Sequence, residues 1–260
     1  MTATTPIEST GATAPLSTTA RPLATRILTI VRLLFANPST AIWTPLSILG
    51  FILLMNIAIF AILRANLPED GETANVNGGA FFIYVYMLVV AVMTINQAFP
   101  LSLGYGSTRR DFLLGFGVFA VILTIGYSIV LATAAMVESW TNGWGVGLNF
   151  FASGTLWQAE WWQAFLFSVL AFLLFFGIGA ATASVYVRWR ATGMYVFWGV
   201  VVVVVLGGAA LATWLEAWGQ VGEFFAWAGV LGSAAWSLII TALCALAAWL
   251  ILRRATPSQG

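Results

Sequence analysis

The side chains that could do chemistry gather in one short segment between two long apolar runs. In LSLGYGSTRRDF, which covers residues 101–112, Arg109 and Arg110 stand side by side between Thr108 and Asp111. Thr108 and an acidic residue three positions later match a capping box, which predicts that a helix begins at Thr108. Its first turn would present two guanidinium groups. Their charge could serve only to hold a turn on the aqueous side of the membrane, or the two groups could form a surface that a soluble partner binds.

Most other reactive chemistry is missing. The chain contains no histidine, so the usual general base, proton relay and transition-metal ligand are absent. Its only cysteine, Cys244, lies in an apolar run, which excludes an intrachain disulfide and a cysteine metal site. An intramembrane enzyme would need a serine–histidine or aspartate pair within its spans. We therefore expect a chain that is not an enzyme and that holds no metal and no cofactor of its own.

The composition places the chain in a membrane. Hydrophobic residues make up 61% and charged residues 7% of its 260 residues, and the mean hydropathy is +0.96. Soluble domains, by comparison, are about one-quarter charged. The net charge of +1 is small and the basic residues are spread thinly, which excludes nucleic acid as a partner. The expected surrounding is a lipid bilayer.

Six stretches are long and apolar enough to cross a bilayer core of about 30 Å, which takes about 20 helical residues. They cover residues 42–63, 81–101, 112–137, 162–187, 194–215 and 230–252. The predicted fold class is therefore an all-α polytopic membrane protein with six transmembrane helices. None of the six carries a charged residue near its middle, which argues against an ion-driven carrier.

The arginines determine the predicted orientation. All the basic residues are arginines, and all but Arg64 fall on one side of the six spans. They are Arg21, Arg26, Arg32, Arg109, Arg110, Arg188, Arg190, Arg253 and Arg254. By the positive-inside rule this side is cytosolic, together with the N- and C-termini. Arg64, at the outer end of the first span, is expected to reach outward and pair with Glu69 or Asp70.

The segments outside the spans have predicted roles of their own. The predicted domains are a disordered cytosolic tail at 1–21, an amphipathic interfacial helix at 22–37, a six-helix transmembrane domain at 38–254 and a cytosolic tail at 255–260. Arg26 and Arg32 fall in the polar sector of the amphipathic helix, opposite apolar residues that would face the inner membrane interface. A polar stripe at helical spacing over 216–223 predicts a short extracytoplasmic helix between the last two spans.

Mild polar groups lie within the predicted spans. Asn56, Asn96 and Gln97 are the residues that could line a transport pathway, since amides within a membrane need partners or water. Most hydroxyl groups are expected to bond to a backbone carbonyl or a neighbouring helix. Small residues are expected to allow close helix packing at Gly177, Gly179, Gly207 and Gly208.

The segment between the second and third predicted spans has the composition of a turn. Pro100 removes a backbone donor and favours a break there, while Gly104 and Gly106 permit tight or left-handed backbone. A plain cytosolic turn satisfies the topology, and so does a stiff protrusion that a soluble partner moves; the residues alone leave both open. Tyr105 and Phe112 would flank the arginines. The residues of this turn that could form such a protrusion are Gly104, Tyr105, Gly106, Ser107, Thr108, Arg109, Arg110, Asp111 and Phe112.

The segment FPLSLGYGSTRRDFLLG, residues 99–115, resembles the membrane subunits of type-2 ATP-binding-cassette (ABC) exporters, especially the short permeases of high-GC Gram-positive bacteria. In such permeases a phenylalanine-rich end of the second span often precedes a small-residue turn, Ser/Thr-Arg and an aromatic residue. The layout over residues 22–254 is similar too, with an amphipathic helix, six spans and a short helix between the last two. The chain departs from large lipid and drug exporters in having no large extracellular domain.

The resemblance implies a permease without its own ATPase, and the sequence has no Gly-rich phosphate loop. ATP and Mg²⁺ would be bound by two cytosolic ABC ATPase subunits that grip the turn and contact the amphipathic helix. A second copy or a related permease is implied, in a bacterial cell membrane, as is export of an amphipathic or lipophilic compound such as a peptide, antibiotic or lipid. The alternative is a six-span substrate-binding subunit of a vitamin-type ABC importer, in which an arginine-bearing turn is not expected.

Overall fold

The computed structural model describes residues 22–66, 78–151 and 160–254, and every regular element within these ranges is a helix. In chain order they are α1 (Leu23–Leu34), η1 (Ser39–Trp43), α2 (Thr44–Asn66), η2 (Gly79–Phe81), α3 (Phe82–Gly104), α4 (Arg109–Trp140), η3 (Gly143–Gly147), α5 (Trp161–Trp214) and α6 (Trp218–Arg254). The all-α class is confirmed. The tails predicted at 1–21 and 255–260 lie outside the described residues.

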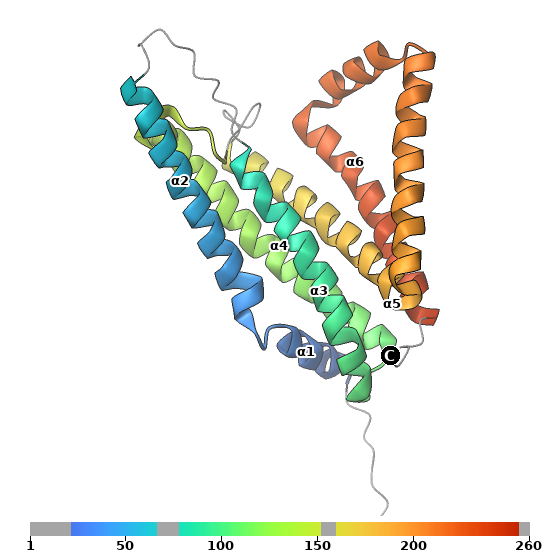
Figure 1. Ribbon diagram of the computed structural model, residues 1–260. Helices are drawn as coiled ribbons and strands as arrows, with labels where there is room; N and C mark the ends of the chain where they lie inside the picture. The colour runs from blue at the N-terminus through green and yellow to red at the C-terminus, as the bar shows by residue number, and fades with distance from the viewer. Residues whose placement is uncertain (1–21, 67–77, 152–159, 255–260) are drawn as a thin grey trace, which may run out of the picture.

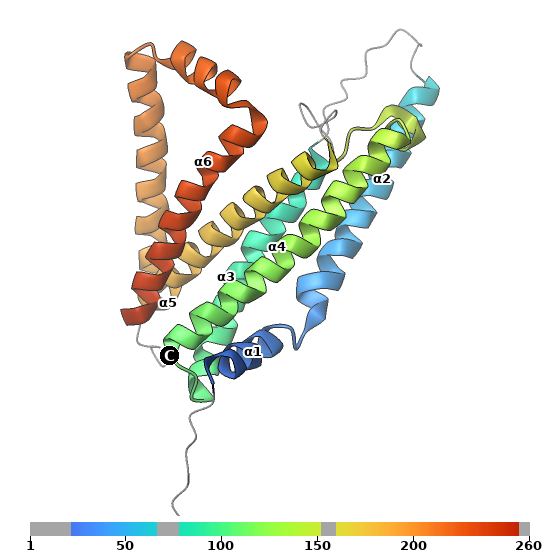
Figure 2. The same ribbon diagram turned by 180° about the vertical axis from the view of Figure 1, so that it is seen from behind.

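The helices form two groups that meet at one end (Figures 1 and 2). α2, α3, α4 and the first half of α5 run side by side as a sheaf, and α1 lies at the lower end of this sheaf in Figure 1. The second half of α5 and the whole of α6 lean away from the sheaf and return to it near the C-terminus. The end of α3, the start of α4 and the end of α6 therefore gather beside α1, and we call this the α1 end.

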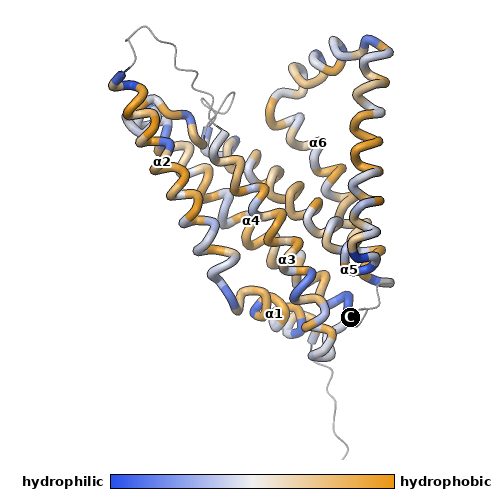
Figure 3. The backbone as a smooth tube through the Cα atoms, in the orientation of Figure 1, coloured by the Kyte–Doolittle hydropathy of each residue, from blue (hydrophilic) through white to orange (hydrophobic). Residues whose placement is uncertain are grey.

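Within the described residues, five helical segments are long and apolar enough to cross a membrane. They are Ser39–Asn66, Gly79–Gly104, Arg109–Trp140, Trp161–Trp214 and Trp218–Arg253. Apolar residues run along these helices, and hydrophilic residues collect near their ends (Figure 3). The chain is thus a multi-pass membrane protein.

α5 contains two of the six predicted spans, because 162–187 and 194–215 both lie almost entirely within its 54 residues. The helix is sharply bent at Arg190, whose φ of 55° and ψ of −146° lie outside the helical region. The two halves turn back on each other there (Figure 1). An unbroken helix of this length would measure about 80 Å, far more than a bilayer core of about 30 Å. The bend therefore divides this long apolar helix into two shorter halves.

α6 is divided in a similar way. Gly229 has φ 65° and ψ −175° and separates residues 218–228 from residues 230–254. The shorter piece corresponds to the helix predicted between the last two spans, and the longer one contains the last predicted span. Glycine suits this position because a positive φ strains any residue that has a Cβ.

Burial is uneven between the two groups of helices. Aromatic residues of α3, α4 and the first half of α5 form much of the core, among them Tyr84, Phe99, Phe112, Phe119 and Phe172. In contrast, none of the residues 186–247 is buried. The second half of α5 and most of α6 consequently present apolar side chains to whatever surrounds the chain, whether lipid or protein.

Two of the predicted packing glycines make close contacts, and two do not. A Cβ on Gly179 would lie 2.7 Å from the carbonyl oxygen of Leu88 and 2.8 Å from the Cβ of Ala91, both on α3. A Cβ on Gly177 would lie 3.4 Å from Cγ2 of Thr241 and 3.5 Å from the Cβ of Cys244 on α6, which is ordinary van der Waals contact. A Cβ added at Gly207 or Gly208 would meet nothing within 4 Å among the described residues, because both lie in the half of α5 that leans away from the sheaf.

Gly179→Ala is expected to destabilise the protein by about 1–3 kcal/mol, since the added methyl group must push α3 and α5 apart in a packed core. The measurement is the thermal unfolding midpoint of the purified chain in detergent. Gly126→Ala is the matched control, because a Cβ at Gly126 meets nothing within 4 Å and the exchange carries the same change in helix propensity. Equal midpoints for the two variants would contradict the α3–α5 packing.

Candidate functional site

α3 ends in a turn that satisfies its own backbone. The N–H of Ser107 donates to the carbonyl of Ser102 at 3.0 Å, and the N–H of Gly106 donates to Leu103 at 2.9 Å, which are the two bonds of a Schellman motif. Gly106 takes the left-handed position with φ 80°. The expectation of a break at Pro100 is wrong, because the proline lies inside α3. Losing one backbone bond does not end a packed membrane helix, which continues for another turn.

α4 begins where the sequence predicts. Thr108 is its N-cap, and Oγ1 of this threonine accepts a hydrogen bond from the N–H of Asp111 at 3.1 Å, an interaction worth about 1 kcal/mol. The Asp111 carboxylate has a further role that a capping box does not predict. Its side chain is 4% exposed, and Oδ2 lies 3.4 Å from Nη1 of Arg26 on α1. The acidic residue thus connects two helices at the positive end of the α4 dipole.

α1 docks on the first turns of α4 through this ion pair and through apolar contacts. Ile30 is 3% exposed, and a Cβ on Gly115 would come within 2.5 Å of the Ile30 Cγ2 atom. One turn further along, the rings of Phe35 and Phe119 have their centroids 4.8 Å apart. α1 is therefore packed on the protein along one side.

The two adjacent arginines have different environments. Nη1 of Arg109 donates a hydrogen bond to the backbone carbonyl of Arg253 at 2.8 Å, which supplies a partner to one of the carbonyls that the end of α6 leaves unpaired. Arg110 is exposed, and so is Arg32, the second arginine predicted for the amphipathic helix. Arg109 thus ties α4 to α6, while Arg110 is accessible to a partner.

Fewer residues of the turn are exposed than the nine that the sequence predicts for it. Tyr105 is 76% exposed, whereas Phe112 is wholly buried and packs on Phe99 with ring centroids 5.2 Å apart. The expectation that Phe112 flanks the arginines at the surface is therefore wrong, because helical spacing places it on the face of α4 that carries Phe116 and Phe119. The residues that remain accessible, which we call the turn surface, are Gly104, Tyr105, Gly106, Thr108 and Arg110.

The predicted pathway residues do not gather in one place. Nδ2 of Asn56 donates to the carbonyl of Ile52 in its own helix at 2.8 Å. Gln97 is exposed and lines a hollow of about 440 Å³ between α1, η1 and α3. The neighbouring Asn96 has a buried Oδ1 with no hydrogen-bond partner among the described residues. The two adjacent amides therefore lie in different surroundings.

At the opposite end of α4 the structure contains a cluster that sequence reasoning missed. Glu138 is wholly buried and accepts hydrogen bonds from Nε1 of Trp144 at 2.9 Å and from the N–H groups of Phe150 at 3.0 Å and Phe151 at 3.1 Å. These bonds fold residues 143–151 back onto the helix. The sequence does contain a signal for this cluster, because an acidic residue in the last turn of a helix opposes the helix dipole and needs compensating hydrogen-bond donors.

Arg64 approaches this folded segment from α2. Its Nη1 lies 3.4 Å from the carbonyl oxygen of Gly145, while the predicted pairing with Glu69 or Asp70 falls outside the described residues. Over residues 22–66, 78–151 and 160–254, no three His, Cys, Asp or Glu side chains gather as metal ligands would.

Asp111→Asn is expected to loosen α1 from α4, because the substitution keeps the backbone cap and removes the charge that attracts Arg26. Losing an ion pair with one exposed partner costs about 1 kcal/mol, which corresponds to roughly fivefold more of the undocked state. Tryptic cleavage after Arg26, followed by mass spectrometry, should accelerate by this factor. Arg110→Gln is the control and should leave the rate unchanged; an unaltered rate in Asp111→Asn would contradict the ion pair's role.

No family model matches the chain, and neither the curated proteins nor the solved structures contain a match to it. The turn between α3 and α4 and its contacts are therefore the features on which a function can be proposed.

Proposed function

We propose that this chain is the transmembrane permease subunit of an ABC transporter that exports an amphipathic or lipophilic compound. Two separate cytosolic ATPase subunits, which bind ATP and Mg²⁺, would grip the turn surface and drive transport. The observation that carries the proposal is this surface: a short, cationic and aromatic protrusion whose base is bonded to other helices. The similarity of residues 99–115 to short exporter permeases points to the same function.

The base of the turn surface can transmit a displacement because it is bonded to elements far apart in the sequence. Asp111 contacts α1 through Arg26, and Arg109 contacts the last turn of α6 through the carbonyl of Arg253. The Schellman motif and the N-cap fix the short connection between α3 and α4. A partner that moves the turn surface would thus move four helices together, as in rigid-body switching.

In the proposed topology the α1 end is cytosolic and the chain crosses a bacterial cell membrane six times, twice within α5. Residues 161–189 and 191–214 correspond to helices of about 43 Å and 36 Å at 1.5 Å per residue, and each exceeds a bilayer core of about 30 Å. The bend of α5 and the end of α6 lie at the α1 end (Figures 1 and 2). The excess of arginines on that side agrees with the positive-inside rule.

A second permease copy, identical or related, completes the proposed transporter. The half of α5 beyond Arg190 exposes large apolar side chains, including Val203 at 71% and Leu206 at 64%, and α6 exposes Trp227 at 84%. Lipid covers part of such a surface, and a partner subunit would cover the rest. The vitamin-type importer subunit remains the alternative, but none of the described contacts favours it over the permease.

The test is co-expression of this chain with the proteins encoded beside it, followed by purification through a tag on the permease and identification of any ABC ATPase that co-purifies. Arg110→Glu is expected to reduce the co-purified ATPase at least about tenfold, since charge reversal at a contact costs about 1.4 kcal/mol or more. Tyr105→Ala should act in the same direction. ATP turnover by the purified complex should fall in parallel.

Arg188→Glu is the matched control, because it reverses the charge of an exposed arginine that lies outside the turn surface. The Arg188 guanidinium stacks on the ring of Trp189. This variant should keep its ATPase. If Arg110→Glu and Tyr105→Ala also keep the ATPase and its turnover, the turn surface is not the contact. If no ATPase accompanies the unaltered chain, the proposed function itself is wrong.

A further inference from the structure

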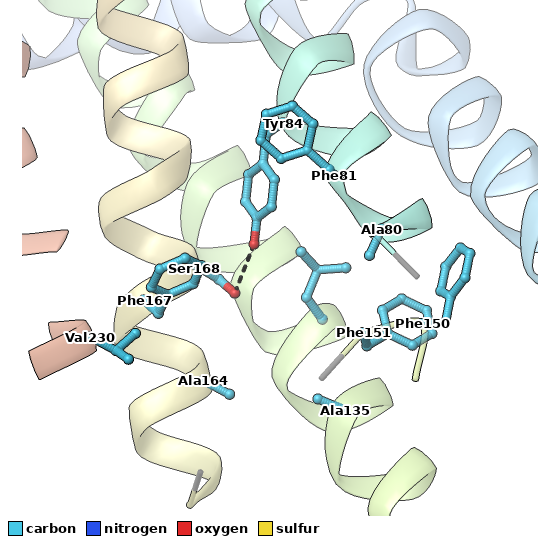
Figure 4. Close-up of a pocket in the computed structure, with 12 residues that line it drawn as sticks. Ala80, Phe81, Tyr84, Ala135, Phe150, Phe151, Ala164, Phe167, Ser168 and Val230 are labelled. Atoms are coloured by element: carbon cyan, nitrogen blue, oxygen red, sulfur yellow. Dashed lines mark hydrogen bonds between the residues drawn. The ribbon is translucent and has the colours of Figure 1, made fainter. Parts of the chain in front are cut away.

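A pocket lies between helices at the end of the molecule opposite α1. It has a volume of about 410 Å³ and is bounded by residues of η2, α3, α4, the first half of α5, the segment after η3, and Val230 of α6. Figure 4 shows aromatic side chains around it, with Phe81 on one side, Phe150 and Phe151 on another, and Phe167 on α5. None of the described residues that line it is charged. A volume in this range suits a small organic ligand.

One polar feature lies in this apolar wall. The Tyr84 hydroxyl donates to Oγ of Ser168 at 3.2 Å, and the two side chains, which both line the pocket, point toward each other (Figure 4). Ser168 is 5% exposed. A serine hydroxyl that accepts one bond still has its own proton to donate, and this proton has no acceptor among the described residues. The pocket thus offers one hydrogen-bond donor in an apolar surrounding.

The aromatic wall formed by Phe150 and Phe151 is fixed from behind. The Glu138 carboxylate accepts the backbone N–H groups of both phenylalanines, and Trp144, which also bonds to Glu138, has its ring centroid 6.3 Å from that of Phe151. A buried carboxylate with several donors is a costly arrangement unless all its bonds are made. The Glu138 cluster therefore keeps this wall of the pocket in place without contributing charge to it.

We propose that this pocket binds an uncharged lipophilic molecule that carries a hydrogen-bond acceptor, such as a ketone, ester or amide carbonyl, with Ser168 as the donor that orients it. Apolar walls bind the body of the ligand by removing its surface from water. A charged ligand would lie in an apolar pocket without a counter-charge, which is unfavourable. Ser168 is thus a specificity residue, and Glu138 is a positioning residue for the wall.

Binding at this pocket requires only the chain itself. That the bound molecule is the transported cargo rests on the proposed function, whereas the binding site does not. A chain that binds the ligand but recruits no ATPase would refute the proposed function and leave the site standing. A chain that recruits the ATPase but shows no site-specific binding would refute the site and leave the proposed function standing.

The test uses the full chain in lipid nanodiscs and two fluorescent probes with the same naphthalene body. One is 6-propionyl-2-(dimethylamino)naphthalene, which has a ketone, and the other is 2-(dimethylamino)naphthalene, which lacks it. After subtraction of empty nanodiscs, the ketone probe should bind saturably. Ser168→Ala should weaken its binding about 3- to 10-fold, the usual effect of one hydrogen bond, and should leave binding of the second probe unchanged.

Ala164→Trp fills the pocket and should abolish saturable binding of both probes, because Ala164 is a buried lining residue. Ala210→Trp adds the same side chain at an exposed position of α5, and this variant should still bind both probes saturably. Size-exclusion profiles verify that each variant is folded. Absence of saturable binding by the unaltered chain, or equal binding by the two tryptophan variants, overturns the site. An equal effect of Ser168→Ala on both probes, or none on either, overturns the role of Ser168.

Discussion

Every backbone hydrogen-bonding group needs a partner, and this constraint is strictest within a membrane, where no water can supply one. Long apolar segments satisfy it by remaining helical. Where α3 gives way to α4, the Schellman bonds and the Thr108 cap supply the partners within a few residues. At the end of α6 the guanidinium of Arg109 supplies one from a different helix. The compact turn surface is a consequence of these local solutions.

α4 carries a buried carboxylate near each of its ends, and the two have corresponding structural effects. Asp111 draws α1 onto the first turn through Arg26, and Glu138 draws residues 143–151 onto the last turn. Only the first agrees with the helix dipole; the second depends on three donors to compensate it. The helix in the middle of the sheaf is thus connected electrostatically to a peripheral segment on both sides. The turn surface and the apolar pocket are separate features supported by the same helix.

Local signals made part of this structure predictable. Hydropathy located the long helices, and the Thr108–Asp111 spacing located the start of α4, because both depend on neighbours in sequence. The position of Phe112, the Arg26–Asp111 pair and the Glu138 cluster depend on which segments meet in space, and spacing alone does not determine that. The hydroxyls also differ: Ser184 bonds to a backbone carbonyl as expected, whereas those of Thr124 and Ser128 are buried without a partner among the described residues.

The reversal of α5 at Arg190 involves a single non-helical residue, and this restricts how the two groups of helices can move. With no loop to supply slack, residues 191–214 can change their angle to the first half of α5, but they cannot slide along it. They form a lever about 36 Å long with its pivot at the α1 end. A rotation of about 10° there displaces the far end of such a lever by about 6 Å. A small rotation at this pivot would therefore be amplified where residues 218–228 lie.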